Sequence, residues 1–362
     1  MRRSIDLGHQ LSAWADSQIA MLFPGSFALV MATGIISNAL FVDDWREFSD
    51  LMGIVEVLAY SSLVFLTVSR AVRFAPALWA DLTNPRVVFS FFTIVASTDV
   101  LGEGIGLRGY MTPALYFWLS ALLLWVVLLY FSFGVFTLLN TTHEADVIYG
   151  GWLLACVATQ SLVTLGTLVA HSLGVLTSAT LVLVLMLWSL GLALYALFVV
   201  LFVYRLFYFE VGPDDFTPVV WVVMGAAAIS TDAGSTLLAA DTGLPFLRLI
   251  RPFIAGATFA AWAWAAWWIP FLLLLEVWKH GVRRVPLAYT PLRWCLVFPL
   301  GMFAVATLRL SLAADLPALR PLSQAMLFIA LVTWAATFIA LVVASWYSFN
   351  EQARRISRFG GR

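Results

Sequence analysis

The sequence predicts an all-α membrane protein, and two properties of the chain carry this prediction. Of its 362 residues, 62% are hydrophobic and only 11% are charged, whereas soluble proteins have about 45–50% apolar and about 25% charged residues. The apolar residues also gather in long runs, and a spanning helix needs roughly 20 of them because the hydrocarbon core is about 30 Å thick. Lipid is the environment that can cover this much apolar surface.

Ten apolar runs, bounded by charged residues, proline or glycine, are long enough to be membrane spans. They occupy 24–41, 51–69, 87–104, 112–138, 150–169, 178–204, 216–239, 252–275, 291–310 and 321–346. We therefore expect one transmembrane domain over residues 1–362 with ten helices. Short cytoplasmic tails are expected at about 1–22 and 347–362. The start of the chain lacks the apolar stretch and cleavage site of a signal peptide, so the first span is expected to begin near Pro24.

The positive charges predict the orientation of these spans. An even number of spans places both termini on one side of the membrane. With the termini inside, 14 of the 20 Lys and Arg residues lie in cytoplasmic regions. The six on the outer side are Arg46, Arg108, Arg248, Arg251, Arg309 and Arg320. Cytoplasmic loops carry an excess of positive charge, so we expect cytoplasmic termini. The compact chain favours a cell inner membrane as its location.

Odd-numbered and even-numbered runs differ in composition. The odd runs are rich in small and polar residues, whereas nine of the 16 Trp residues lie in the even runs. Small residues let helices approach closely, and polar residues are costly against lipid. We therefore expect the odd helices inside and the even helices outside, with their aromatic side chains toward lipid. This alternation predicts five helical hairpins around a central pore.

Small and polar residues of the odd runs recur at helical spacing, so they can line a polar path. These candidates are Ser26, Thr33, Gly34, Ser37, Thr93, Ser97, Gln160, Thr164 and Thr231. The alternative is that they only pack the helices together. The sequence leaves both interpretations open.

Two acids, Asp99 and Asp232, fall inside odd runs, where a charge is expensive and often functional. One interpretation is structural: each bonds to Ser, Thr or backbone, or pairs with Arg309 at the outer end of the ninth run. The other is that one of them exchanges a proton and couples it to anion movement, which would make the protein a transporter.

The ninth run contains Pro299 near its middle, where proline removes a backbone hydrogen bond and bends the helix. Phe298 precedes the bend and shares a helix face with Gly301. An aromatic ring projecting from this position toward the axis would block ions by its bulk and by dewetting. By spacing alone, Phe298 also fits an ordinary core position.

Two segments resemble the tellurite-resistance/dicarboxylate transporter family, which includes TehA and the plant guard-cell slow anion channels. They are Phe23-Pro-Gly-Ser-Phe-Ala-Leu-Val-Met-Ala-Thr-Gly34 and Trp294-Cys-Leu-Val-Phe-Pro-Leu-Gly301. The resemblance extends over all ten spans. It implies five hairpins around a pore lined by the odd helices, a homotrimer with one pore per subunit, and anion permeation occluded by a phenylalanine of the ninth helix. The matching position in this chain is Phe298.

Two functional hypotheses follow. The first is an anion channel or uniporter that conducts small anions past a gate at Phe298. The second is a proton-coupled exporter of dicarboxylate, sulfite or tellurite-type oxyanions, which would use Asp99 and Asp232. The formal charge of zero disfavours nucleic acid as a partner.

An enzyme or photoreceptor is disfavoured by the inventory of reactive residues. The single lysine, Lys279, lies in a loop, so no Schiff base can form inside a span. The four histidines lie in tails or loops without ligand spacing, so we expect no metal and no other cofactor.

Overall fold

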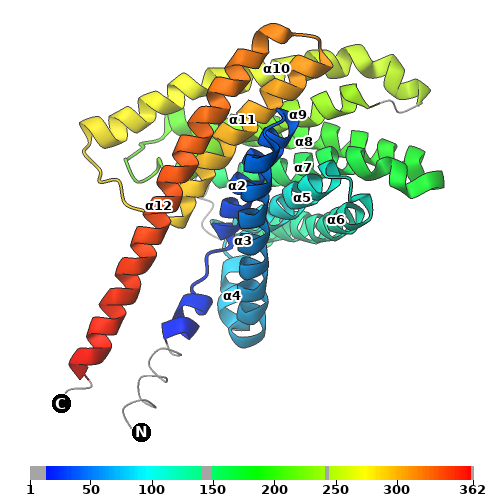
Figure 1. Ribbon diagram of the computed structural model, residues 1–362. Coiled ribbons are helices and arrows are strands. Elements are labelled where there is room, and N and C mark those ends of the chain that lie inside the picture. The colour runs from blue at the N-terminus through cyan, green and yellow to red at the C-terminus, as the bar shows by residue number, and fades with distance from the viewer. Residues whose placement is uncertain (1–13, 140–148, 241–243, 360–362) are drawn as a thin grey trace.

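The computed structural model (Figure 1) describes residues 14–139, 149–240 and 244–359, and no strand occurs in these ranges. Residues 1–13 and 360–362 of the two expected tails lie outside the described residues. The prediction of an all-helical protein with many helices able to span a membrane is confirmed. Nine helical segments of the described ranges are long and apolar enough to cross a membrane.

The helices follow the ten apolar runs. The odd runs form α2 (Ala28–Val42), α5 (Phe92–Leu107), α7 (Leu153–Val169), α9 (Val222–Ala239) and α11 (Trp294–Ala313). The even runs form α3 (Arg46–Arg73), α6 (Met111–Gly134), α8 (Thr177–Tyr208), α10 (Pro245–Glu276) and α12 (Arg320–Phe359). A short helix, α4 (Ala75–Leu82), follows α3. The longest of the nine segments, Gly150–Tyr208, contains both α7 and α8, which are separated at Gly174 by a non-helical backbone with φ 54° and ψ −113°.

Helix α12 is longer than the apolar run that predicts it. It continues through most of the segment expected as a tail and ends at Phe359. Figure 1 shows its last turns projecting beyond the rest of the bundle, toward the end where α4 lies. Trp14 and Phe349 meet edge to face there, with ring centroids 6.4 Å apart.

Burial separates the helices into two sets. In the most apolar stretch of α2, α5, α9 and α11, 78% to 89% of the residues are buried, against 6% to 28% in α3, α6, α10 and α12. Helix α7 is also buried along nearly its whole length. We call α2, α5, α7, α9 and α11 the inner helices. The outer helices are α3, α6, α8, α10 and α12.

Contacts between helices give the arrangement of the two sets. Each inner helix contacts two others, in the closed order α2, α5, α7, α9, α11 and back to α2. Each inner helix also packs closely against the outer helix that follows it in the chain. The inner helices therefore surround a common axis.

The tryptophans of the outer helices correct one expectation. We expected them to face lipid, but five are buried against the inner helices: Trp118, Trp125, Trp188, Trp268 and Trp334. Three outer tryptophans donate their indole N–H to a threonine of an inner helix, and each threonine donates in turn to the carbonyl four residues earlier. The pairs are Trp125 with Thr159 at 2.8 Å, Trp262 with Thr307 at 3.0 Å, and Trp334 with Thr33 at 2.9 Å. A buried indole needs such an acceptor, so these tryptophans attach the outer helices to the inner ones.

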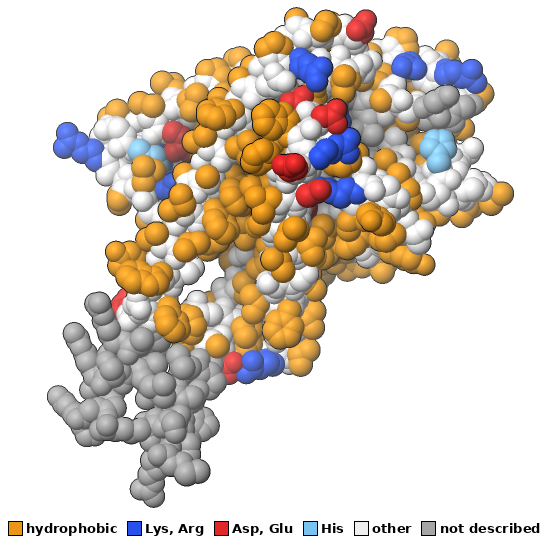
Figure 2. Space-filling model, in the orientation of Figure 1, with side chains coloured by type: hydrophobic (Ala, Val, Ile, Leu, Met, Phe, Trp, Pro, Cys, Tyr) orange, Lys and Arg blue, Asp and Glu red, His pale blue; other side chains and the backbone are white. Residues whose placement is uncertain are grey.

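The surface is strongly apolar between its charged ends. Figure 2 shows hydrophobic side chains over much of the visible face, while charged side chains gather mainly in its upper half, with a few at the lower edge of the coloured part. A large apolar band of this kind is expected of a surface that contacts lipid.

Candidate functional site

All five inner helices begin with a short 3-10 turn, and these turns meet at one end of the bundle. The turns are Pro24–Phe27, Val88–Phe91, Gly150–Trp152, Pro218–Trp221 and Pro291–Arg293. Three of them start with proline, which suits a first helical position because its missing N–H has no partner there anyway. The turns contact one another in the same closed order as the helices.

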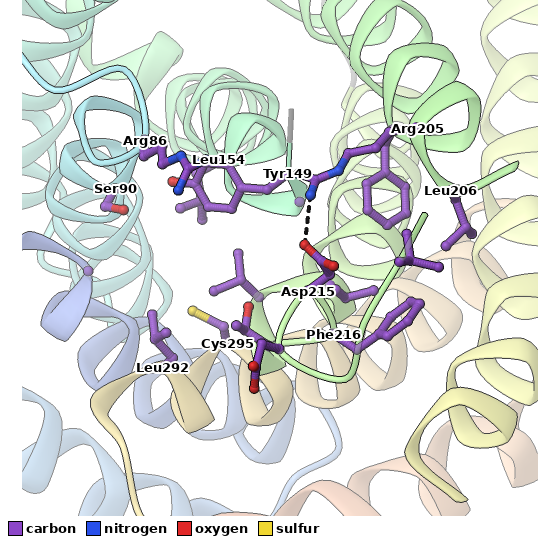
Figure 3. Close-up of a pocket in the computed structure, with 18 of the residues that line it drawn as sticks. Arg86, Ser90, Tyr149, Leu154, Arg205, Leu206, Asp215, Phe216, Leu292 and Cys295 are labelled. Atoms are coloured by element: carbon purple, nitrogen blue, oxygen red, sulfur yellow. Dashed lines mark hydrogen bonds and ion pairs between the residues drawn. The ribbon is translucent and has the colours of Figure 1, made fainter. Parts of the chain in front are cut away.

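A cavity of about 480 Å³ lies among these turns, and residues of all five turns line it. We call it the N-terminal cavity because five helix N-termini point toward it. Figure 3 shows Ser90, Leu154 and Tyr149 on one side of the space and Leu292 and Cys295 on the other. Helix N-termini carry partial positive charge, so their convergence favours an anion in this cavity.

Charged side chains also line the N-terminal cavity. Arg86 and Arg205 contribute two positive charges, and Arg205 pairs with Asp215 at 2.7 Å. Glu210 and Asp214 lie in the same lining, so the side chains alone do not make the cavity positive. Burial raises the pKa of Tyr149 to about 12.

Phe298 lies one helical turn beyond Cys295 of the N-terminal cavity. Its side chain is buried, with 1% exposure. Arg309 follows Phe298 by eleven positions, which corresponds to three full helical turns plus about 20°. The two side chains therefore leave α11 on the same face. Arg309 reaches Glu103 of α5, and α5 is not a neighbour of α11 in the closed order of inner helices. This face is therefore the one directed at the axis.

The opposite face of α11 carries Phe303 and Thr307. The ring of Phe303 stacks on Trp262 of the outer helix α10, with centroids 6.3 Å apart. Thr307 accepts the indole N–H of the same tryptophan. Phe298 and Phe303 are thus two buried phenylalanines of one helix that point to opposite sides.

Pro299 and Gly301 fix α11 between its two neighbours. A Cβ added to Gly225 of α9 would lie 2.9 Å from Cγ of Pro299, and one added to Gly301 would lie 2.9 Å from Cγ2 of Ile35 in α2. Ordinary carbon contacts are about 3.5–4.0 Å. The two glycines therefore let both neighbouring helices approach α11 beside Phe298.

The two predicted intramembrane acids lie in the inner helices and are buried. Asp232 accepts a hydrogen bond from Nη1 of Arg309 at 3.0 Å, and Nη2 of the same arginine pairs with Glu103. Asp99 lies one turn before Glu103 and accepts a hydrogen bond from Ser161 at 2.7 Å. One oxygen of each aspartate thus has the partner that the structural interpretation predicts, which is a serine for Asp99 and Arg309 for Asp232.

The polar residues proposed to line a path lie in different surroundings. Thr33 contacts Trp334 of α12, and Gln160 donates to the Trp188 carbonyl of α8 at 3.2 Å, so both side chains reach outer helices. Ser37 bonds to the Ser49 carbonyl of α3, and Gly34 packs against Glu56 and Val100. Ser26 is half-buried in the first turn. Four others bond to backbone carbonyls of their own helix or its entry turn: Thr93, Ser97, Thr164 and Thr231.

Sequence reasoning missed two buried acids, Glu103 and Glu56. Glu56 belongs to the outer helix α3, and its carboxylate lies where a side chain at Gly34 would be. Both acids lie inside predicted spans, at 51–69 and 87–104. The cost of a charge within a span is the signal that identifies them.

Within the described ranges, no three His, Cys, Asp or Glu side chains gather as metal ligands. Cys156 and Cys295 are both free and buried. The arrangement offers a cavity, an aromatic side chain and charged groups along an axis, which suits passage of a solute.

Relatives of this chain occur in Mycobacterium tuberculosis and Methanocaldococcus jannaschii. A family model described as SLAC1, voltage-dependent anion channel, matches residues 22–342. Uncharacterized membrane proteins of the M. tuberculosis strains CDC 1551 / Oshkosh and H37Rv are 41% identical over 143 residues, covering 39% of this chain and 72% of each relative. An uncharacterized transporter of M. jannaschii is 24% identical over 290 residues, covering 78% of this chain and 82% of the relative.

Proposed function

The chain belongs to the SLAC1 family of voltage-dependent anion channels, and from this premise we propose that it conducts small anions through a path gated by Phe298. The proposed path is enclosed by the five inner helices. It begins at the N-terminal cavity, passes Phe298 beside Pro299, and continues toward Arg309.

We further propose ten transmembrane helices arranged as five hairpins. The non-helical backbone at Gly174 supports dividing Gly150–Tyr208 into two spans, because 59 residues of helix would be roughly 88 Å long. The close packing of each inner helix on the outer helix that follows it supports the hairpins. The positive charges support cytoplasmic termini in a cell inner membrane, and the family resemblance supports a homotrimer with one path per subunit.

The position of Phe298 is the observation that carries the proposed function. It shares the axis-directed face of α11 with Arg309 and stands one turn beyond the N-terminal cavity. An aromatic side chain in this position closes the path by its bulk. Few charges are needed at such a gate, because weak binding favours fast conduction.

Anion flux in proteoliposomes tests the gate. Replacing Phe298→Ala is expected to raise chloride and nitrate flux by at least about tenfold without a proton gradient, because the obstruction is removed. Phe303→Ala is the matched control, since it deletes an equally buried ring that faces α10 instead of the axis. Each truncation costs stability by a similar amount, about 3–5 kcal/mol in soluble proteins.

The comparison of the two variants decides between a gate and general loosening. A rise confined to Phe298→Ala supports the gate. Equal rises in both variants would indicate that any cavity in α11 makes the bundle leak. No flux from either folded variant would contradict the channel function.

A proton-coupled transporter of dicarboxylate, sulfite or tellurite-type oxyanions is the second candidate. Asp99 and Asp232 favour it, because each buried carboxylate has one oxygen, Oδ1, without a hydrogen-bond partner among the described residues. The name of the M. jannaschii relative, a transporter, agrees with it. Oxyanion uptake should then follow an imposed pH gradient and lose that dependence in Asp99→Asn, but keep it in Asp44→Asn, a loop acid paired with Arg46.

A further inference from the structure

Arg309 crosses the space enclosed by the inner helices. Its guanidinium donates to Asp232 of α9 at 3.0 Å, lies 3.5 Å from the Thr236 hydroxyl, and pairs with Glu103 of α5. Helix α9 is next to α11 in the closed order, but α5 is separated from it by α2 on one side and by α7 and α9 on the other. An ion pair between α11 and α5 therefore lies across the axis.

We propose that Arg309 is the anion-binding residue of the outer half of the path. Glu103 and Asp232 bind its guanidinium while no anion is bound. The inference rests on the proposed path, which it extends from the gate to a charged binding site. The ligand class is a small monovalent anion that accepts hydrogen bonds, such as nitrate or chloride.

Burial shows that this arginine lies mainly inside the bundle but is not sealed. Side-chain exposure is 14% for Arg309, 5% for Glu103 and 1% for Asp232. The acids are thus enclosed, whereas part of the Arg309 side chain is accessible. This accessible part is where an approaching anion would first meet the arginine.

The charges around Arg309 explain why an anion depends on it. Two carboxylates of the inner helices, those of Glu103 and Asp232, pair with this one guanidinium, and a third, that of Asp99, lies one turn from Glu103 on the same helix. Oδ1 of Asp99 and Oδ1 of Asp232 are buried and have no hydrogen-bond partner among the described residues. Without Arg309, these groups would repel any anion in the path.

Arg108, which follows the last residue of α5, is held by a different set of partners. Arg108 pairs with Asp50 at 3.0 Å and donates to the Gly104 carbonyl, Ser49 and Ser37. Its partners belong to α2, α3 and α5. Arg108 therefore does not replace Arg309 as a ligand across the axis.

Competition gives the two acids a role in conduction. A guanidinium has five N–H donors in a planar fork that fits carboxylates and oxyanions equally well. An entering anion exchanges with the Glu103 or Asp232 carboxylate for these donors, and the carboxylate returns when the anion leaves. The resident acids thus keep anion binding weak, which fast passage requires.

Ligand-dependent thermal stability tests this site directly, without relying on flux. The purified full-length protein is heated at increasing nitrate concentrations, with gluconate replacing nitrate so that ionic strength stays constant. A ligand that binds only the native state raises the Tm, and the rise grows with the logarithm of ligand concentration relative to its Kd. The variants are Glu103→Gln/Asp232→Asn, Arg309→Lys and Glu103→Gln/Arg309→Gln/Asp232→Asn.

The expected order of nitrate affinity follows from the competition. Removing both acid charges should tighten nitrate binding by about tenfold or more, because charge-assisted competitors are lost. Arg309→Lys should retain weaker binding. The triple variant removes the arginine and also the two acid charges, so no buried carboxylate is left without its partner. Its Tm should not depend on nitrate concentration. Arg251→Gln is the control, since this exposed arginine of α10 bonds to the Leu238 carbonyl instead.

Two results would overturn the assignment. One is a nitrate-dependent Tm rise in the triple variant equal to that of Arg251→Gln. The other is unchanged nitrate affinity in Glu103→Gln/Asp232→Asn. Failure of the gate looks different: nitrate binding that depends on Arg309, but no flux through Phe298→Ala, would keep the site and reject the gate.

Discussion

The close approach of α9 to Pro299 makes Gly225→Ala a sharp test of the packing beside Phe298. The added Cβ would lie 2.9 Å from Cγ, 3.1 Å from Cβ and 3.3 Å from Cα of Pro299. The proline ring is rigid and part of the contact is backbone, so the two helices must separate by several tenths of an ångström. Overpacking of this kind costs about 1–3 kcal/mol.

Two further glycines calibrate this cost. A Cβ at Gly301 would meet Cγ2 of Ile35 at 2.9 Å and Cγ1 of Ile36 at 3.1 Å. These atoms are bonded directly to Cβ of buried, β-branched side chains that are stiff at χ1, so Gly301→Ala should also cost about 1–3 kcal/mol. A Cβ at Gly256 of α10 would meet nothing within 4 Å, so Gly256→Ala should stay within about 0.5 kcal/mol of wild type.

The assay is the Tm of each variant in one detergent at one protein concentration. For a chain of this size, 1–3 kcal/mol corresponds to a fall of roughly 1–6 °C. We expect falls of this size for Gly225→Ala and Gly301→Ala, and none beyond about 1 °C for Gly256→Ala. Equal Tm values for Gly225→Ala and Gly256→Ala would refute the described contact between α9 and Pro299.

Three other perturbations have defined outcomes. Thr33→Val removes the acceptor of the Trp334 indole and should lower stability by about 0.5–1.5 kcal/mol, measured as a fall in Tm, while Thr33→Ser should restore most of it. Tyr149 keeps its proton in the folded protein up to a pKa of about 12, whereas an unfolded tyrosine loses it near 10. Stability should therefore fall between pH 10 and 12, and Tyr149→Phe should reduce that fall in pH-dependent Tm measurements. Arg205→Gln removes a cation of the N-terminal cavity and should slow anion flux through Phe298→Ala at low salt, with little effect at high salt because the charge is then screened.

The spans were predictable because their signal is local. An uninterrupted apolar run of about 20 residues suffices to predict a helix able to span a membrane, and each predicted run overlaps one α-helix of the structure. The contrast between inner and outer helices was also visible, since small residues and tryptophans alternate along the chain. The length of α12 beyond residue 346 was not visible, because a helix that leaves the apolar region has no comparable signal.

The candidate site was less accessible to sequence reasoning because its contacts join distant residues. Asp232 and Arg309 were expected to pair as one of two alternatives, and the structure contains that pair. Glu103, 206 positions before Arg309, was not expected to join it. Likewise, the polarity of Thr33 and Gln160 was visible but their direction was not. A polar side chain can form its hydrogen bond with an indole or carbonyl of a neighbouring helix as well as with solvent in a path. Its polarity therefore does not reveal its direction.

The confinement of α11 by Gly225 and Ile35 has a consequence for how fast a subunit can respond. Because both neighbouring helices touch α11 on either side of Phe298, a rigid-body swing of this helix would have to move α2 and α9 together. Rotation of one benzyl group about its two side-chain torsions needs no such rearrangement. Collective helix motions take microseconds to milliseconds, and a change confined to one side chain avoids them. We therefore expect openings with almost no change in the backbone, so that open and closed states would superimpose closely in α2, α9 and α11.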